Sequence, residues 1–209
     1  MSKAFVYTEL QISIPFADYP WSTVNALIQQ EPGFRNKTWL SGVKTLSAGG
    51  FYEFDSIENA KKYAVNYFPA AAKRRGVAQT TRVFNGDVVE EASRYLNSAH
   101  FGGTVTQKPG AFVYTEAQVS APFDQAPWRQ MNPILKAQPG LLHKTWLSGV
   151  NTNSVGGFYA FDTIENATRF VTDYFPTETA ALDVAYTTRL FDASVVEEAS
   201  RAIHSPFFI

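Results

Sequence analysis

Two copies of one stretch decide the fold of this chain: Lys37–Val43 (KTWLSGV) and, about 107 residues later, Lys144–Val150 with the same letters. A second shared stretch follows each of them, Gly49–Asp55 (GGFYEFD) and Gly156–Asp162 (GGFYAFD). The two copies align without a gap, and roughly half of the matched positions are identical. The chain is therefore predicted to hold two tandem copies of one domain.

The length of the chain fits this division. A chain of 209 residues makes two domains of about 100 residues each, which we place at residues 1–101 and 111–209. Residues 102–110 have the composition of a linker. A domain of this size buries a modest core, so the two copies are expected to pack on each other.

The composition excludes several classes of site and partner. A net charge of −1 gives no reason to expect nucleic acid or an anionic membrane as a partner. Without cysteine there is no disulfide, no thiolate nucleophile and no cysteine-ligated metal. The sequence shows no signal peptide and no apolar run long enough to cross a bilayer, so a cytoplasmic location is expected.

Each copy has the element order of a ferredoxin-like α+β domain: strand, helix, strand, strand, helix, strand, helix. In the first copy the strands are predicted at 4–14, 35–43, 50–55 and 77–84, with helices after Pro20, Asp55 and Asp87. Asp55–Glu58 and Asp87–Glu90 resemble capping boxes, and Pro69 is expected to kink or end the second helix. Gly49 and Gly50 are expected in the hairpin between the two middle strands.

Helices on one side of such a sheet leave its other face bare. We expect the bare face to carry Phe5, Tyr7, Lys37 and Trp39 and to pack against the same face of the second copy. Two sheets packed in this way would enclose a space and form an intramolecular dimeric α/β barrel.

Several short motifs follow one another in the first copy: Glu31–Phe34 (EPGF), Lys37-x-Trp39, Gly49-Gly50-x-Tyr52-x-Phe54, Ala60-x-x-Tyr63 and Gly76-Val77. Their order and spacing resemble the YdhR-like monooxygenases of the dimeric α/β-barrel superfamily, which includes the antibiotic-biosynthesis monooxygenases. The resemblance covers nearly all of each copy. It implies a small hydrophobic ligand in the cavity of the domain and, in some relatives, oxygenation of aromatic enols without metal or flavin. It brings no catalytic motif that can be transferred residue by residue.

Oxygenation without a cofactor needs a base, donors that hold the substrate anion, and a dry aromatic cage. Histidine is the natural base, and of the three histidines His143 is the candidate, at the start of the second strand of copy two. Alternation places His143 opposite Lys144 and Trp146, which counts against one shared cavity. His100 and His204 are expected at the surface.

Glu9 and Glu116 are twin carboxylates in the first strands of the two copies. A carboxylate that faces a closed cavity has a raised pKa and can act as a base. Alternatively, each forms an ion pair with the lysine of the neighbouring strand, Lys37 or Lys144. Both interpretations are open.

Arg82 and Arg189, in the fourth strands, could steady an oxyanion or bridge to these carboxylates. A substrate pocket could be lined by side chains that the copies share: Tyr7, Lys37, Trp39 and Phe51 in the first, and Tyr114, Lys144, Trp146 and Phe158 in the second. For most of the aromatic residues, plain hydrophobic core is the alternative. Lys73–Arg75 is basic where Ala180–Leu182 is not, which indicates a solvated helix end.

The copies diverge at a few positions that matter for function. Phe34 and Arg35 become Leu141 and Leu142, Glu53 becomes Ala160, and Gln79 becomes Tyr186. A fused pair can specialise in a way that a symmetric dimer cannot. Our hypothesis is that one pocket performs the chemistry, and the apolar pair beside His143 favours copy two.

The sequence thus predicts a cofactor-independent monooxygenase that acts, with O₂, on a small hydroxylated aromatic or heteroaromatic compound of the hydroxyanthrone, quinol or hydroxyindole type. No cofactor and no metal is expected. The alternatives are a barrel that binds a small hydrophobic molecule, or a non-oxidative cyclase or isomerase. A haem-binding barrel would need an axial ligand, for which only His143 is suited. A homodimer of the fused chain stays open.

Overall fold

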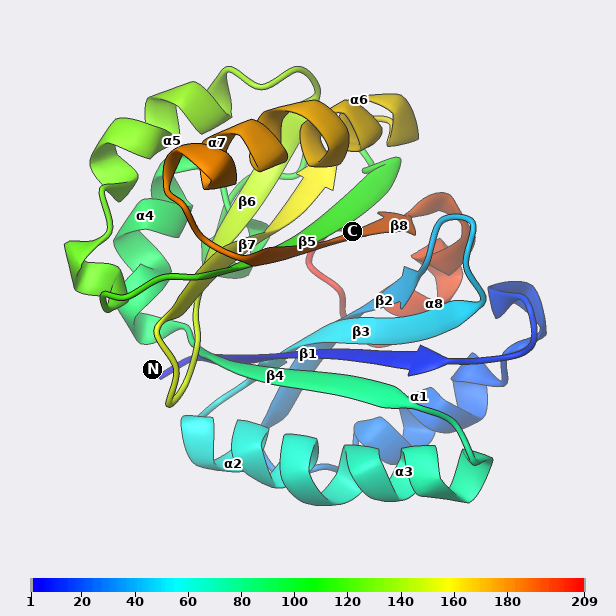
Figure 1. Cartoon of the computed structure of the whole chain (residues 1–209). Coiled ribbons are helices and arrows are strands. Elements are labelled where there is room, and N and C mark those ends of the chain that lie inside the picture. The colour runs from blue at the N-terminus through cyan, green and yellow to red at the C-terminus, as the bar shows by residue number, and fades with distance from the viewer. Residues whose placement is uncertain (1, 209) are drawn as a thin grey trace. The chain divides into compact units, whose positions relative to one another are not determined.

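The computed structural model describes residues 2–208 and divides into two compact units. Unit 1 comprises residues 1–87 together with 193–209, and unit 2 comprises residues 88–192. Each unit contains one four-stranded antiparallel sheet with helices, as Figure 1 shows. The α+β, ferredoxin-like class predicted from the sequence is confirmed.

The elements follow the predicted order, with strands that differ from the predicted ranges by up to three residues at their ends. Unit 1 contains β1 (Ala4–Gln11), α1 (Trp21–Ile28), β2 (Phe34–Ser41), β3 (Ser47–Phe54), α2 (Ile57–Lys62), α3 (Phe68–Arg75), β4 (Gln79–Asn85) and α8 (Glu197–Arg201). Unit 2 contains α4 (Glu90–Tyr95), β5 (Ala111–Gln118), α5 (Trp128–Lys136), β6 (Leu141–Ser148), β7 (Ser154–Phe161), α6 (Ile164–Arg169), α7 (Phe175–Ala181) and β8 (Tyr186–Asp192). The strand orders β2-β3-β1-β4 and β6-β7-β5-β8 are the same arrangement twice.

The helix that ends each sequence copy belongs to the unit built from the other copy. In unit 1, the Ser200 hydroxyl, in α8, accepts a hydrogen bond from the backbone N–H of Trp39 at 2.9 Å, and Figure 1 shows α8 beside β2. In unit 2, the Ser93 hydroxyl, in α4, accepts the equivalent bond from Trp146 at 2.9 Å. The compact units therefore differ from the two sequence copies by this exchange of helices. The domain boundaries expected from the repeat stay a prediction.

The second helix of each copy changes its winding before the proline instead of ending there. A π-helical turn, Tyr63–Tyr67, joins α2 to α3, and Phe170–Tyr174 joins α6 to α7 in the same way. Pro69 lies in the first turn of α3. Proline lacks the N–H donor and crowds the preceding turn, and a wider π turn accommodates both defects. The helix therefore does not end at Pro69, and its winding changes locally before the proline.

The residue that caps this helix is the serine after the expected aspartate. The Ser56 hydroxyl accepts from the backbone N–H of Asn59 at 3.2 Å, while the Asp55 carboxylate accepts from the Asn59 side chain at 2.8 Å. Thr163 and Asn166 repeat the cap in unit 2 at 3.2 Å. The capping box that was expected to begin at Asp55 was therefore placed one residue early.

The pairing register corrects one expectation about the faces of the sheet. In β3, Tyr52 pairs with Val6 on one side and with Lys37 on the other, and residues directly opposite each other share a face. Lys37 and, two residues on, Trp39 therefore lie on the face that carries the helices. Phe5 and Tyr7 lie on the opposite face, so the prediction that all four share one bare face was wrong. Alternation within a strand does not fix its phase relative to the next strand. The sheet-to-sheet barrel concerns the relation between the units and stays a prediction.

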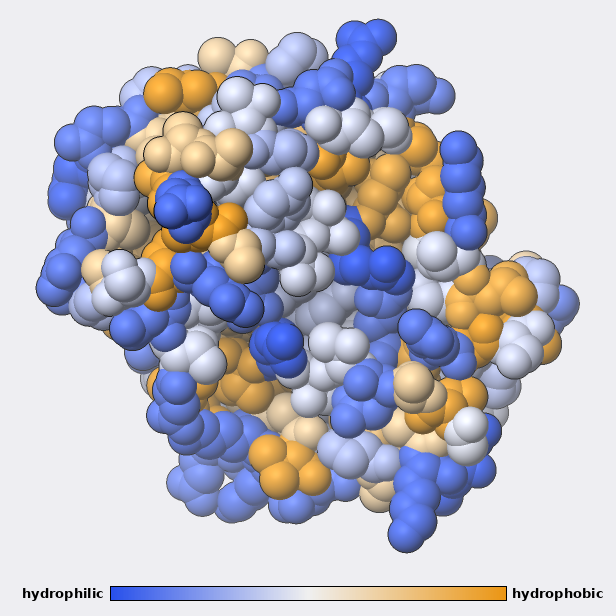
Figure 2. All heavy atoms as spheres, viewed as in Figure 1, coloured by the Kyte–Doolittle hydropathy of each residue, from blue (hydrophilic) through white to orange (hydrophobic). Residues whose placement is uncertain are grey.

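The surface gives no sign of a membrane span. Within residues 2–208 no helix is both long and apolar enough to cross a bilayer. On the face shown in Figure 2, hydrophilic side chains cover most of the surface and hydrophobic ones form small groups between them.

Candidate active site

Each unit has a pocket between the helix-bearing face of its sheet and the helices that cover it. The pocket of unit 2 has a volume of about 170 Å³, lies against α5 and α7, and includes Lys144, Trp146 and Tyr159 among its lining residues. The pocket of unit 1 has a volume of about 120 Å³, lies against α1 and α3, and includes the equivalent Lys37, Trp39 and Tyr52. We call these the unit 2 pocket and the unit 1 pocket. They are the same place in the fold, occurring twice.

A buried lysine forms the floor of each pocket. Lys37 and Lys144 are each 1% exposed. The Lys37 Nζ lies 2.7 Å from the ring centroid of Trp39, and the Lys144 Nζ lies 2.9 Å from that of Trp146. Within residues 2–208 no carboxylate lies within ion-pair distance of either amine. Burial lowers the pKa of both lysines well below the usual range, because apolar surroundings disfavour the charged form of an amine.

Glycine makes the room that each lysine occupies. Gly50 and Gly157 lie inside β3 and β7, so the expectation that the glycine pairs form the hairpin turns was wrong. A Cβ added at Gly157 would lie 2.7 Å from Cε of Lys144 and 2.6 Å from the ring of Tyr159. A Cβ at Gly50 would overlap Lys37 in the same way. Because glycine has no side chain, this face of the sheet leaves space at that position, and the methylene chain of the lysine occupies it.

The tryptophan of each pocket is held by an asparagine and by the exchanged helix. The Trp39 indole N–H donates to Oδ1 of Asn25 at 2.8 Å, and the Asn25 side chain donates to the carbonyl of Ala199 at 2.9 Å. Unit 2 repeats these bonds with Trp146, Asn132 and Ala92, at 2.8 and 3.0 Å. Sequence reasoning missed both asparagines. Their signal was a twin polar residue on the apolar face of an amphipathic helix, four residues after Trp21 and Trp128.

The unit 1 pocket has a basic mouth. Its lining includes Arg74 and Arg75, from the end of α3, together with Tyr19. The positive charge of Arg75 adds to burial in lowering the pKa of Lys37. The expectation that Lys73–Arg75 is merely a solvated helix end therefore needs correction, because two of its three side chains reach the pocket.

The unit 2 pocket has an apolar mouth with one carboxylate. Ala126 and Leu182 take the places of Tyr19 and Arg75, and Glu178 takes the place of an alanine. Burial lowers the pKa of Lys144, and the negative charge of Glu178 partly opposes that shift. The two lysines thus differ in the charge that each one faces.

The expected catalytic carboxylates lie on the opposite face of their sheets. Tyr7 donates to the Glu9 carboxylate at 2.7 Å, and Tyr114 donates to Glu116 at 2.6 Å. Tyr7 pairs across the sheet with Arg82, so this arginine shares their face. The alternative ion pairs of these carboxylates with Lys37 and Lys144 are wrong, since the partners lie on opposite faces.

The remaining predicted residues of that face also lie away from the pockets. Phe51 stacks on Phe5 at 5.2 Å between ring centroids, and Phe158 stacks on Phe112 at 5.3 Å. Arg189 pairs across the sheet with Tyr114. The described residues that line the two pockets include Lys37, Trp39, Lys144 and Trp146, and none of the other predicted site residues. The roles expected for those others stay predictions.

The histidines have distinct surroundings. The imidazole Nδ1 of His143 donates to the backbone carbonyl of Asn97 at 2.6 Å, and burial lowers its pKa while this bond raises it. The side chains of His143 and Lys144 lie on opposite faces of β6, as the alternation predicted. His204 is exposed as expected, but His100 is only 3% exposed, so its expected surface position was wrong. His100 lies in a 3₁₀ turn, Ala99–Phe101, that packs against β6.

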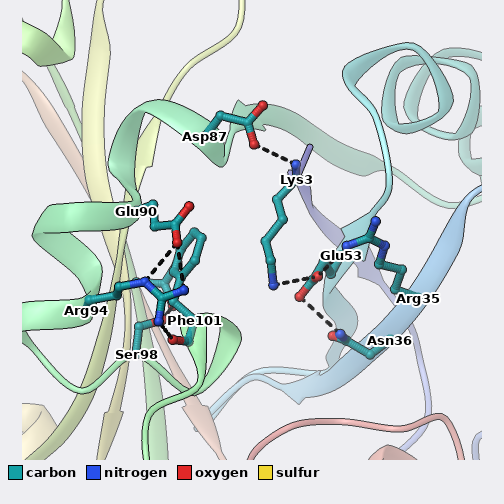
Figure 3. A network of polar contacts seen from close by, with 10 residues as sticks. Lys3, Arg35, Asn36, Glu53, Asp87, Glu90, Arg94, Ser98 and Phe101 are labelled. Atoms are coloured by element: carbon teal, nitrogen blue, oxygen red, sulfur yellow. Dashed lines mark hydrogen bonds and ion pairs between the residues drawn. The ribbon is translucent and has the colours of Figure 1, made fainter. Parts of the chain in front are cut away.

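A buried polar cluster distinguishes unit 1 on the face opposite its pocket. Figure 3 shows the Glu53 carboxylate between the Lys3 amine, at 2.9 Å, and the Arg35 guanidinium, at 3.4 Å, with Asn36 donating to it at 3.2 Å. Unit 2 has Gly110, Leu142, His143 and Ala160 at these positions. Of the divergent positions noted in the sequence, Arg35 and Glu53 thus belong to one cluster. Among residues 2–208 no group of three or more histidine or acidic side chains is arranged to hold a metal ion.

Comparison with known proteins agrees with this architecture. Residues 10–99 match the family described as "Putative mono-oxygenase ydhR". No curated protein matches the chain.

Three solved structures resemble the whole chain at low sequence identity. A protein described as a putative chlorite dismutase is 12% identical with a TM-score of 0.57, over 94% of this chain and 98% of that one. An anthrone oxidase-like protein is 13% identical with a TM-score of 0.54, over 91% and 90%. A putative monooxygenase from Fusobacterium nucleatum is 10% identical with a TM-score of 0.50, over 91% and 92%. Likeness at this level of identity shows a shared fold. The family match concerns the copy that supplies the sheet of unit 1.

Proposed function

We propose that this protein is a mono-oxygenase that acts without a metal or organic cofactor on a small hydroxylated aromatic or heteroaromatic compound, bound in the unit 2 pocket. The observation that carries the proposal is the buried amine of Lys144, which lies over Trp146 in a largely apolar pocket and whose pKa is lowered by burial. The family match supports the class of reaction.

The size of the pocket favours a small substrate. A dry cavity of about 150 Å³ holds a benzene molecule, and the unit 2 pocket has about 170 Å³. A quinol or a hydroxyindole fits this space, whereas the three fused rings of a hydroxyanthrone would extend through the mouth. Trp146 and Tyr159 give the lining an aromatic character that suits a flat ring.

Lys144 is placed to act as the base. An uncharged amine can accept the proton of a phenol or enol, and the ammonium that results holds the substrate anion beside it. Glu178 lines the same pocket, and its charge favours the protonated lysine after the transfer. Lys37 faces Arg75 instead, which disfavours a second positive charge. The chemistry therefore belongs to unit 2.

The reaction balances with O₂ as the only oxidant. The substrate anion gives one electron to O₂, and the radical and superoxide that result combine into a peroxide at carbon. Loss of water then leaves a carbonyl, so that R₂CH₂ and O₂ give R₂C=O and H₂O. The C–H bonds of one carbon are broken, one oxygen atom enters the product, and the other leaves as water. An apolar pocket protects the peroxide from competing reactions.

The test is O₂ uptake by metal-free protein with a panel of quinols, hydroxyindoles and hydroxyanthrones. We expect Lys144→Met to lower kcat about 100-fold or more, because a general base contributes this much. The matched variant Lys37→Met should keep most of the activity. The rate should fall as the pH drops, since a protonated lysine cannot accept the proton. Equal losses in both variants, or none in Lys144→Met, would contradict the role of Lys144.

If Lys144 acts as the base of a reaction that does not use O₂, the same experiment gives a different result. If Lys144 served a non-oxidative isomerase or cyclase, the protein would exchange substrate C–H for solvent deuterium without consuming O₂. Exchange that depends on Lys144 in the absence of uptake would replace the proposal with that alternative.

A further inference from the structure

We propose that the unit 1 pocket is a second, separate binding site that takes a small aromatic anion, such as a one-ring carboxylate. This goes beyond the proposed oxygenation, which concerns the unit 2 pocket. The two pockets share their floor, so the difference in ligand must come from the residues around it.

Cationic side chains gather at the mouth of the unit 1 pocket. Arg74 and Arg75 both line it. The Arg75 guanidinium donates to the carbonyl of Ala71 at 3.2 Å and lies 5.8 Å from the ring of Tyr19. It is close enough to Lys37 to lower the pKa of that lysine further than burial alone. A carboxylate at this position would meet two guanidinium groups, which bind carboxylates well.

Tyrosine hydroxyls line the same pocket where unit 2 has apolar side chains. Tyr19 and Tyr63 line the unit 1 pocket, and the equivalent residues of unit 2 are Ala126 and Phe170. Tyr63 is 1% exposed, and the nearby Tyr52 adds to burial in raising the pKa of its hydroxyl. A buried, protonated hydroxyl can donate a hydrogen bond to an anionic ligand.

Negative charge is excluded from the lining. The described residues that line the unit 1 pocket include no aspartate or glutamate. Glu31 acts on Tyr63 and Tyr67 from outside the lining, where it adds to burial in raising the pKa of both hydroxyls. In the unit 2 pocket, by contrast, Glu178 is a lining residue. A ligand that enters as an anion, such as a carboxylate, is therefore favoured in the unit 1 pocket. The unit 2 pocket favours a neutral ligand, which becomes an anion only by giving its proton to Lys144.

The volume limits the anion to one ring. The unit 1 pocket has about 120 Å³, somewhat less than the cavity of about 150 Å³ that holds benzene. A ring against the aromatic lining, with its carboxylate at Arg74 and Arg75, satisfies both ends of the pocket. Lys37 would gain a counter-ion in such a complex, so binding should draw a proton onto its amine.

The experiment compares two probes that differ in charge, 4-fluorobenzoate and 4-fluorobenzyl alcohol, by ¹⁹F NMR titration and calorimetry of the full chain. The double variant Arg74→Ala, Arg75→Leu carries the residues that unit 2 has at these positions. We expect it to weaken 4-fluorobenzoate binding about ten-fold or more, since hydrogen bonds to charged groups are worth this much. Binding of the alcohol should change by less than about two-fold. Lys73→Ala, which removes one positive charge outside the lining, should leave both affinities unchanged.

The reciprocal variant transfers the site. Glu178→Ala with Ala181→Arg and Leu182→Arg gives unit 2 the charges of unit 1, and a second 4-fluorobenzoate should then bind. Calorimetry in buffers of different ionisation enthalpy should show proton uptake with the wild type and none with Lys37→Met. Benzoate affinity that is unchanged by Arg74→Ala, Arg75→Leu, or that depends on Lys144 instead of Lys37, would overturn the proposal. O₂ uptake by the same variants is measured separately, so failure of the oxygenase proposal would be visible on its own.

Discussion

The unit 1 and unit 2 pockets have the same floor and different mouths. In both, a lysine lies over a tryptophan beside a tyrosine, and a strand glycine leaves the space for it. At the mouth, Arg74 and Arg75 of unit 1 correspond to Ala181 and Leu182 of unit 2. The floor is constrained from several sides at once, by the sheet, the asparagine and the exchanged helix. The mouth lies at an exposed helix end, where substitutions cost little.

The opposite faces of the two sheets differ in a coordinated way. The Glu53 carboxylate of unit 1 has cationic and amide partners, and all of these positions change together in unit 2. Removing one member of a buried cluster leaves the others without partners, which is expensive. Residues at the pocket mouth can therefore change one at a time between the two copies, whereas the residues of this cluster change together.

The largest difference in stability between the two units should result from removing the exchanged helix of one of them. A chain that ends at Asp192 lacks α8 but keeps every residue of unit 2. Unit 1 would lose the partners of Trp39 and Asn25 and the fully buried Val196 and Ile203. These losses are of order 5 kcal/mol, comparable to the whole stability of a small domain.

Hydrogen exchange read by mass spectrometry measures this effect. We expect the amides of β2 to lose protection while those of β6 keep theirs. Equal protection of the two strands in the truncated chain would show that the exchange of helices is not required by unit 1.

The two buried lysines should make the free energy of unfolding depend on pH. The folded pKa of each lysine lies below the unfolded value of about 10.4. Between these two values the unfolded chain binds one more proton at each site. The free energy of unfolding therefore rises with pH, by up to about 1.4 kcal/mol per pH unit for each lysine, until the unfolded pKa is reached.

Urea unfolding between pH 7 and 10 checks this slope. Lys37→Met and Lys144→Met should each flatten it, because methionine has nothing to titrate. Exposed Lys73 is the matched control, and Lys73→Met should leave the slope as it is. A wild type with no rise in this range would mean that the buried amines are charged in the folded state.

The hydrogen bonds of Asn25 and Asn132 are equivalent in the two units, so substitutions of these residues should affect the stability of both units alike. Asn25→Leu and Asn132→Leu each leave a buried indole N–H without its acceptor. We expect each to lower the free energy of unfolding by about 2 kcal/mol. Adding Trp39→Phe or Trp146→Phe in the same unit removes the stranded donor, so the double variants should lose less than the sum of the single effects. Simple additivity in urea unfolding would argue against these bridges.

The fold could be predicted from the sequence, while the site could be predicted only in part. The repeat, the strand alternation and the turn residues determine the order of elements, and their lengths leave few other topologies. Lys37, Trp39 and their twins were predicted as pocket residues because both copies retain them. Their companions on the opposite face, such as Tyr7 and Glu9, were grouped with them because alternation gives faces within a strand only.

Two other features depend on contacts that no local pattern encodes. Asn25 positions Trp39 only because α8, from the far end of the chain, supplies the carbonyl that fixes the asparagine. Arg74 and Arg75 were interpreted as a solvated helix end because their charge pattern does not show that α3 packs beside the pocket. Long-range packing decides both cases, and a single sequence does not contain that information in readable form.

The exchange of helices also sets a schedule for synthesis. Ser93 is synthesised 53 residues before Trp146, so α4 is already available when the strands of unit 2 leave the ribosome. Trp39 must wait for Ser200, which is 161 residues further along the chain, or roughly ten to thirty seconds at ordinary rates of translation. During that interval β2 lacks the helix α8 that packs against it, so chains arrested before residue 193 should be cut by protease within β2. The part of the protein that is made first is thus the last to be finished.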